Sequence, residues 1–285
     1  MNYTEVNLDL QSVAKRIYQN IIYRSTFYKM LNDSYIGTLR QTGTPMIEVI
    51  KNSAVTINTR STKEITTALT PSLMGYSSVK VDLTELPMDY SIRIPVLVAG
   101  TDILNALDSA LEKKDGAVAK AIDTYGFGKL AADTDITEKT WSASSSEDYI
   151  SLITGLSAAM FNVDVYDNYR LGLAATEYGN YVAALTSVLK YETMAGVEGV
   201  DRGTIARAYG VDAFPINDSV LGTNSSSTAV KGYFFNPIAV VGDAFFDSFV
   251  QYNGNYPGFP GYFVFEGNVL FGAEVVEPTA IFRLV

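Results

Sequence analysis

The first clear hydrophobic pattern lies near the N-terminus and has the period of an α-helix. Apolar residues recur three and four positions apart between Leu10 and Ile22, which places them on one face of a helix. Residues 1–40 are also basic, with five Lys and Arg against three Asp and Glu and hence a net charge of +2. An apolar stripe so near a terminus needs a partner, which is either the body of its own chain or a neighbouring subunit.

The next region, residues 45–95, is rich in residues that favour β-strands. The stretch "AVTINTRSTKEITTALTPSL" (54–73) contains many threonines and few large apolar residues, and residues 79–83 alternate between apolar and charged. This pattern predicts a long two-stranded hairpin. Such a ribbon is marginally stable by itself in water, so we expect it to lie on another part of the molecule or on another molecule.

A long amphipathic helix is predicted over residues 100–131, with Thr101 or Asp102 as its N-cap. The glycines within it suggest a bend and a loose end. A polar linker follows. A second region starts at about residue 145 with a helix capped by Ser144 or Ser145, three positions before an acidic residue.

Strands and helices alternate in the rest of the chain. A short buried strand is predicted at 170–176, with Thr176 capping the helix after it. A further helix is predicted with Asn236 as its cap and Pro237 at its first position. The tail, from Gly261 to Val285, reads as one strand after another.

Composition restricts the chemistry that is available. The chain has 285 residues, 47% of them hydrophobic and 18% charged, a net charge of −10, and neither cysteine nor histidine. This composition is typical of an ordered globular protein, and it excludes disulfides, zinc fingers, Ser-His-Asp triads and histidine metal sites. We therefore expect no enzyme activity and no cofactor. No apolar run reaches the length of a membrane helix, and the first residues have no secretory signal, so no membrane partner is expected.

Three stretches invite a chemical interpretation. The glycine-rich "GVEGVDRGTIARAYG" (196–210) lacks the spacing of phosphate-binding loops, so its glycines are read as turn geometry. The acids in 133–135 and 164–167 match no calcium loop and are read as turn formers rather than a catalytic pair. The aromatic residues of 249–265 favour core and interface packing over a sugar-stacking platform.

Taken in order, these elements resemble those of the major capsid proteins of tailed bacteriophages, which have the HK-type coat fold. Five segments carry the resemblance. They look like the family's spine helix, its strand–helix step, its glycine-flanked strand pair, a following helix and its closing strands: "ALEKKDGAVAKAIDTYGFGKLA", "RLGLAATEYGNYVAALTSVLK", "VDRGTIARAYGVDAFPINDSV", "FFNPIAVVGDAF" and "FEGNVLFGAEVVEPTAIFRLV".

The resemblance implies an α+β fold with four parts. These are an N-terminal arm (1–40), an extended β-hairpin loop with a lead-in (41–95), a peripheral domain containing the spine helix (96–145 and 247–285) and an axial domain (146–246). The two features without a partner in the residue pattern, the arm and the hairpin, then become contacts with neighbouring subunits.

The resemblance also implies a structural function. Subunits would form hexamers and pentamers of an icosahedral shell, assembled in the cytoplasm of a bacterial host, that encloses double-stranded DNA without sequence-specific binding. The body starts almost at once, which implies a separate scaffolding protein, and a portal and decoration proteins are further expected partners. The candidate assembly contacts are Ile17, Ile21, Arg24, Arg60, Lys63, Arg202 and Arg207.

Two other functions remain open at this stage. An encapsulin, the shell protein of a bacterial compartment, has the same fold and a similar length, although the N-terminal "G-P-x-G" segment associated with encapsulins is not present. The other alternative is a carbohydrate-acting enzyme or sugar-binding module that uses the acids and tyrosines.

Overall fold

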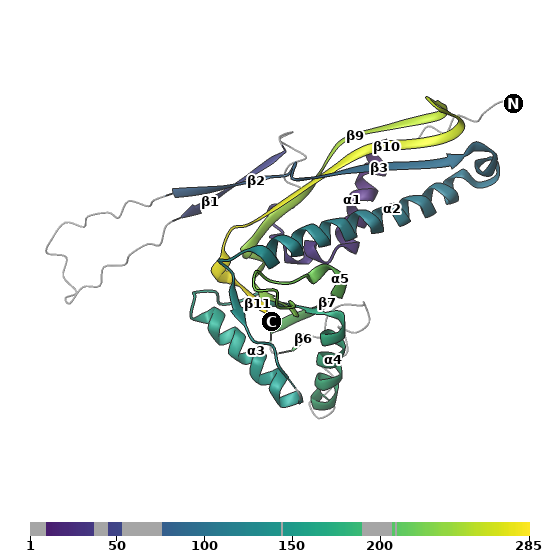
Figure 1. The fold of residues 1–285 in the computed structure, drawn as a ribbon. Helices are drawn as coiled ribbons and strands as arrows, with labels where there is room; N and C mark the ends of the chain where they lie inside the picture. Colours follow the sequence, from purple (N-terminus) through teal and green to yellow (C-terminus); the bar gives the residue numbers. More distant parts are fainter. Residues whose placement is uncertain (1–9, 37–44, 53–75, 144, 190–206, 209) are drawn as a thin grey trace, which may run out of the picture.

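The computed structural model describes residues 10–36, 45–52, 76–143, 145–189, 207–208 and 210–285. It consists of two sheets with helices packed on them and a two-stranded hairpin that extends away from both (Figure 1). In the described residues, no helix is both long enough and apolar enough to cross a membrane.

The upper part of the molecule is a long antiparallel sheet with a long helix beneath it (Figure 1). Its strand order is β3-β10-β9, with β3 at Leu86–Pro95, β9 at Val240–Tyr256 and β10 at Phe259–Val275. The helix α2 (Val96–Ala132) follows β3 directly. The first helix, α1 (Leu10–Arg24), as the hydrophobic pattern predicts, and a 3-10 turn, η1 (Phe27–Met30), pack against α2.

The lower part is a six-stranded mixed sheet. Its order is β4 (Thr137–Lys139), β11 (Ile281–Leu284), β8 (Gly232–Phe235), β5 (Arg170–Ala174), β7 (Val211–Ile216) and β6 (Arg207–Ala208). The pairs β4–β11 and β5–β7 are parallel and the other three pairs are antiparallel. The strands β4 and β11 come from the two ranges expected in the peripheral domain, and the chain passes between the two sheets three times, from β3 to β4, from β8 to β9 and from β10 to β11.

Three helices accompany this sheet: α3 (Ser146–Phe161), α4 (Ala175–Leu189) and α5 (Asp218–Leu221). The cap of α3 is the predicted one, because the Ser145 side chain and the Asp148 backbone and side chain form a reciprocal capping box. The cap of α4 differs from the prediction. The helix begins one residue before Thr176, and the Asp218 carboxylate accepts a hydrogen bond from the Ala175 N–H at 2.6 Å.

One aromatic core joins the two sheets. The ring of Phe127 on α2 stacks on Tyr233 of β8, with centroids 5.8 Å apart. On its other side, Phe27 meets Phe127 edge to face at 5.3 Å and Phe271 of β10 at 6.2 Å. Because these side chains are fully buried, the helix α2 is packed between the upper sheet and the lower one.

The hairpin consists of β1 (Met46–Asn52) and β2 (Tyr76–Asp82), paired antiparallel from Met46 opposite Asp82 to Asn52 opposite Tyr76. This confirms the two-stranded ribbon for the described part of the region. The lead-in that follows is β3, which pairs with β10 along its whole length and therefore belongs to the long sheet.

The predicted helix boundaries at α2 need correction. The helix starts at Val96, four residues before the predicted range, because Pro95 lacks the N–H that a continuing strand would need and its φ of −61° suits the residue before a helix. The predicted loose end is also wrong, because Gly126 lies within the helix. A Cβ at Gly126 would lie 2.5 Å from the Phe27 ring, so this glycine permits close packing.

The helix predicted after Asn236 is wrong in length. Asn236 does cap the segment, since its side chain accepts a hydrogen bond from the Ile238 N–H. Only one 3-10 turn follows, Pro237–Ala239. The chain then enters β9, where the β-branched Val240 and Val241 pair with the end of β10.

Candidate functional site

In its described part, the hairpin is fixed to the body by one of its two faces. Three of its side chains form a small separate apolar cluster with Leu83 directly after β2, with one residue of β9 and with the residue directly after β10: Ile47, Val49, Val81, Leu83, Val241 and Val276. Gly272 of β10 lies so close that a Cβ there would be 1.9 Å from the Asp82 carbonyl oxygen. The ion pair between Lys51 and Glu277, at 3.6 Å, adds a polar contact.

The opposite face of the hairpin is exposed and carries large apolar side chains. Ile50 is 66% exposed and Met46 is 47% exposed. The hairpin projects away from both sheets (Figure 1), and a two-stranded ribbon has too little apolar area to be stable alone. Its outer face is therefore a surface suited to contact with another molecule.

A half-buried charge cluster lies where the hairpin, α2 and β10 meet. The Lys129 ammonium donates hydrogen bonds to Glu85 at 2.8 Å and to Glu274 at 2.5 Å, and the Tyr125 hydroxyl also donates to Glu85. Burial raises the pKa of Glu85, but the hydrogen bonds from Lys129 and Tyr125 outweigh it and hold the pKa below its usual value. This cluster fixes the segment after β2 to the long helix.

The N-terminal helix packs on its own chain. Ile17 and Ile21 are fully buried, in a core cluster shared with both sheets. They were candidate assembly contacts, and the structure corrects this, since neither side chain has surface left for a neighbouring subunit. The exposed side of α1 carries Tyr23, which is 83% exposed, together with Lys15.

Three buried or largely buried aspartates tie this segment to the rest of the chain. Asp123 of α2 accepts hydrogen bonds from the Ser25 and Thr26 hydroxyls and from the backbone N–H groups of Thr26 and Phe27, at 2.5–3.2 Å. The other two are Asp115, which accepts from Asn20 and Tyr90, and Asp243, which accepts from Tyr18 and Tyr28.

Burial is the main cause of two pKa shifts in this region, those of Asp115 and Tyr28. It raises the pKa of Asp115, only partly offset by the hydrogen bonds from Tyr90 and Asn20. Burial, followed by the Asp243 charge, raises the pKa of the Tyr28 hydroxyl. Sequence reasoning missed these aspartates. The available signal was that Asp115 and Asp123 lie among Leu111, Val118 and Ile122 in the apolar pattern of the long helix.

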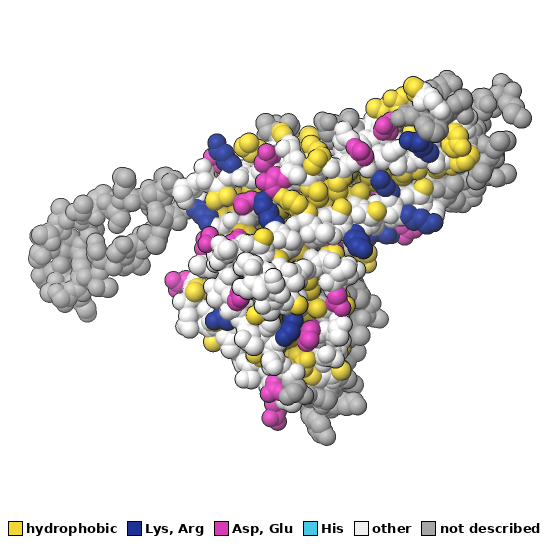
Figure 2. All heavy atoms as spheres, in the orientation of Figure 1, with side chains coloured by type: hydrophobic (Ala, Val, Ile, Leu, Met, Phe, Trp, Pro, Cys, Tyr) yellow, Lys and Arg dark blue, Asp and Glu magenta, His cyan; other side chains and the backbone are white. Residues whose placement is uncertain are grey.

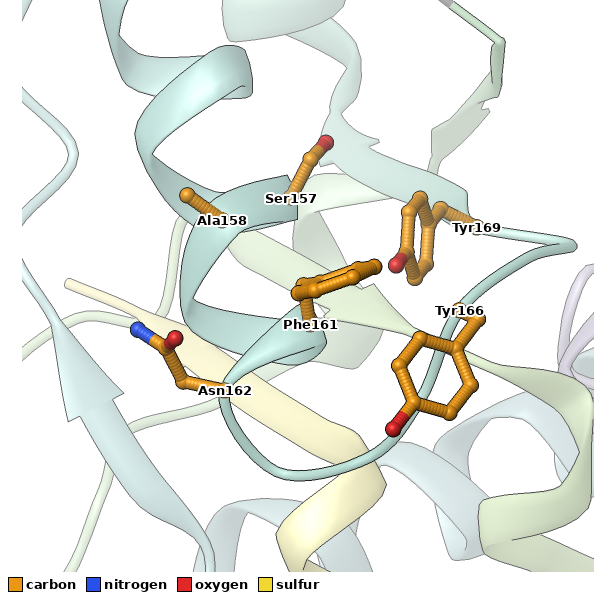
Figure 3. A pocket seen from close by; sticks show the side chains of 6 residues that line it. All are labelled: Ser157, Ala158, Phe161, Asn162, Tyr166 and Tyr169. Carbon is orange, nitrogen blue, oxygen red and sulfur yellow. The ribbon is translucent and has the colours of Figure 1, made fainter.

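A shallow hollow of about 390 Å³ lies at the end of α3. Figure 3 shows Phe161, Tyr166 and Tyr169 around it, and the Phe161 and Tyr166 rings meet edge to face at 4.8 Å. Phe161 is 59% exposed and Tyr166 is 58% exposed. Since no charged side chain lines the hollow, its chemistry suits apolar contact rather than catalysis.

The acidic stretches form turns, as the residue types indicate. Asp133 accepts a hydrogen bond from the Asp135 N–H at 2.8 Å. Asp164 has a left-handed backbone, with φ of 64°, and accepts from the Tyr166 hydroxyl at 2.6 Å. Within the described ranges, no group of three or more His, Cys, Asp and Glu side chains is placed to hold a metal ion.

The aromatic stretch 249–265 is mainly packing, as expected. Phe249 stacks on Phe265 at 5.0 Å and meets Tyr90 edge to face. Phe263 and Phe265 are buried. These rings fill the space between the long sheet and α2, so they do not form an open platform.

The remaining candidate contacts are arginines and one lysine. Arg24 pairs with Glu112 of its own chain at 2.5 Å, although its side chain stays 35% exposed. Arg207 lies on the edge strand β6, opposite Asp212 of β7, and Gly210 turns between these strands with a φ of 77°. Arg60, Lys63 and Arg202 lie outside the described residues.

No protein-family model matches this sequence, and no curated protein matches it. Solved structures do match over nearly the whole chain. A structure from Mycobacterium phage Che8 has a TM-score of 0.61 at 16% identity, covering 91% of this chain and 90% of its own. The capsid of Ralstonia phage GP4 has a TM-score of 0.59 at 8% identity, covering 90% and 86% respectively.

A virus-like particle from Pyrococcus furiosus matches as well, with a TM-score of 0.52 at 12% identity and coverage of 98% of this chain and all of its own. The chain therefore has the fold of shell-forming proteins. It is the HK-type coat fold that the sequence resemblance implies, and the matched structures are mostly phage capsids.

Proposed function

We propose that this chain is the major capsid protein of a tailed bacteriophage. Its subunits assemble into hexamers and pentamers of an icosahedral shell around double-stranded DNA. The proposal rests on the match to phage capsid structures over about nine-tenths of the chain and on the hairpin, whose Ile50 and Met46 are large apolar side chains exposed on its outer face.

The parts of the subunit have separate roles in this proposal. The peripheral domain (96–145 and 247–285) contains α2 and β10 and contributes β4 and β11 to the six-stranded sheet, and the axial domain (146–246) contains β5, β7 and β8 and meets its copies at capsomer centres. The exposed aromatic side chains at the end of α3 contribute to subunit contacts. Arg24, Arg60, Lys63, Arg202 and Arg207 remain proposed assembly contacts. Scaffolding, portal and decoration proteins are proposed partners, in a virion assembled in the host cytoplasm.

Electron microscopy of the purified full-length protein tests the proposal directly. We expect capsomers or closed shells, and a compact monomer under all assembly conditions would overturn it. The variant Ile50→Asp places a charge on the outer face of the hairpin and should strongly reduce the shell yield. Because Ile50 is 66% exposed, the free energy of unfolding of the subunit should hardly change. The matched variant Ile50→Val should keep the yield of the parent protein.

An encapsulin-type shell is the second candidate, because the Pyrococcus furiosus virus-like particle matches this chain over 98% of its length. Both candidates predict shells, so the contents decide between them. Native particles should contain DNA that resists added nuclease. Particles that hold enzymes and no protected DNA would assign the chain to the compartment class.

A further inference from the structure

Unpaired lysines gather on one element of the fold. Lys113 and Lys120 are exposed on α2, and Lys114 is partly exposed between them. Lys113 and Lys120 are seven residues apart, so they lie on the same side of the helix and about 10.5 Å apart along its axis. Figure 2 shows dark blue side chains following the line of α2 across the upper part of the molecule.

The carboxylates of the same region are already engaged. In the part of α1 and α2 whose side chains are described, Asp108 pairs with Arg16 at 2.8 Å and Glu112 pairs with Arg24. The other two, Asp115 and Asp123, are buried and accept hydrogen bonds from hydroxyls and amides. In these described parts of α1 and α2, no carboxylate is therefore left free to neutralise Lys113, Lys114 or Lys120, whereas Lys129, farther along α2, is paired with Glu85 and Glu274.

On the lower sheet, in contrast to the unpaired lysines of α2, the described basic side chains are engaged by other groups of the chain. Lys139 lies over the Phe282 ring, Lys231 donates to the Trp141 carbonyl, and Arg283 is buried against Glu138. Acidic residues such as Glu147 and Asp167 are exposed there, and magenta side chains outnumber dark blue ones around this part of Figure 2. The unpaired lysines named above are therefore a local feature of α2 in a chain whose net charge is −10.

We propose that the exposed face of α2 carrying Lys113, Lys114 and Lys120 binds the phosphate backbone of duplex DNA, and so lines the inside of the shell. This rests on the proposed function. Lysine is a point charge suited to phosphates rather than to reading base edges. Duplex DNA has one charge per about 1.7 Å of its axis, so a row of ammonium groups finds phosphates at any register. A shell repeats the row in every subunit, so weak contacts act together.

The test measures DNA binding of soluble capsomers as a function of salt, with shell formation followed on the same samples. Each neutralised phosphate contributes about −0.9 to the slope of log K against log salt. Three lysines give a slope of about −2.7 per subunit, or an affinity loss of about 40-fold between 50 and 200 mM salt. The double variant Lys113→Gln/Lys120→Gln should keep about −0.9, or a loss of about 3- to 4-fold.

Two further variants are controls for this experiment. Lys113→Arg/Lys120→Arg keeps both charges and should keep the slope of the parent protein. Lys80→Gln removes an exposed lysine from the hairpin and should also leave the slope unchanged. Equal slopes for the double Gln variant and the parent would overturn the proposal. So would binding of polyglutamate in preference to DNA, which would assign the surface to an acidic protein.

A second measurement locates this face in the shell. The chain has no cysteine, so Ala117→Cys places a single thiol on the exposed side of α2, between the two lysines. A maleimide on a large polymer should label this thiol in free capsomers and not in closed shells. Labelling of closed shells would overturn the interior placement. If no shells form at all, the proposed function fails, independently of the DNA result.

Discussion

Asp123 is the residue through which the N-terminal segment depends most directly on α2. Its two carboxylate oxygens accept four hydrogen bonds from three consecutive residues, Ser25, Thr26 and Phe27. We consider the change Asp123→Asn, which keeps the shape of the side chain but replaces one acceptor oxygen by an NH₂ group. Hydroxyl donors can rotate to accept from that group, whereas a backbone N–H cannot.

The size of the effect follows from this asymmetry. If the amide nitrogen takes the place of the oxygen that faces Thr26, the Thr26 backbone N–H is left without an acceptor, which costs about 1–3 kcal/mol. The bonds that remain lose their charge and about half their strength. We therefore expect Asp123→Asn to lower the free energy of unfolding by about 2–4 kcal/mol.

Urea unfolding of the full-length subunit, followed by circular dichroism, measures this change. The matched control is Asp108→Asn, the same substitution on the same helix at a half-exposed ion pair with Arg16, where the expected loss is about 0–1 kcal/mol. If Asp123→Asn costs no more than the control, the buried carboxylate does not hold the segment and the reasoning is refuted.

Gly272→Ala should destabilise the subunit by about 1–3 kcal/mol, because the added Cβ would meet the backbone of β2. Gly155→Ala, in open space on α3, should instead stabilise it by about 0.5–1 kcal/mol. Thermal unfolding of both variants measures this difference. Because burial raises the pKa of Asp115 above its usual 3.8, this carboxyl costs stability as the pH rises through that raised pKa. The free energy of unfolding of Asp115→Asn should therefore rise relative to that of the parent protein as the pH increases above 3.8, and a pH-independent difference would contradict this. The pKa of Glu85 is lowered from 4.5. Its contribution to the free energy of unfolding is therefore present above pH 4.5 and is lost as the pH falls through the lowered pKa of the folded state. Burial raises the pKa of Tyr125, the hydroxyl donor to Glu85, to about 12. Tyr125→Phe should lower the free energy of unfolding by about 0.5–1 kcal/mol at pH 7 and by less at pH 3. Urea titrations at both pH values measure this.

The parts of the fold that the sequence predicts well are those encoded by neighbouring residues. The apolar period of α1 and the capping box of α3 need only side chains three or four positions apart. The start of α2 is different. Residues 96–99 are apolar and partly β-branched and suit a strand, and the helix begins there because Pro95 ends the pairing of β3 with β10. That pairing partner lies more than 160 residues away.

In the candidate functional site too, features encoded by neighbouring residues were predictable and those set by distant contacts were not. The hairpin was predictable as a ribbon without a core, since its threonines and its alternating residues lie within one stretch of sequence. Which side of α1 faces its own chain was not predictable. Ile17 and Ile21 would look the same on an arm that packs against a neighbour, and only the distant acceptors Asp115, Asp123 and Asp243 decide the question.

The hydrogen bond between Tyr18 and Asp243 joins residues 225 positions apart, and the paired residues of β4 and β11 are 145 positions apart. Contacts of such long range form slowly, because much chain entropy is lost before they add stability. Asp243, which accepts from Tyr18 of the N-terminal helix, lies in β9, so the complete docking of this helix needs that distant part of the chain. The complete surface of the protein therefore depends on residues near the C-terminus, and an incomplete chain presents a different surface.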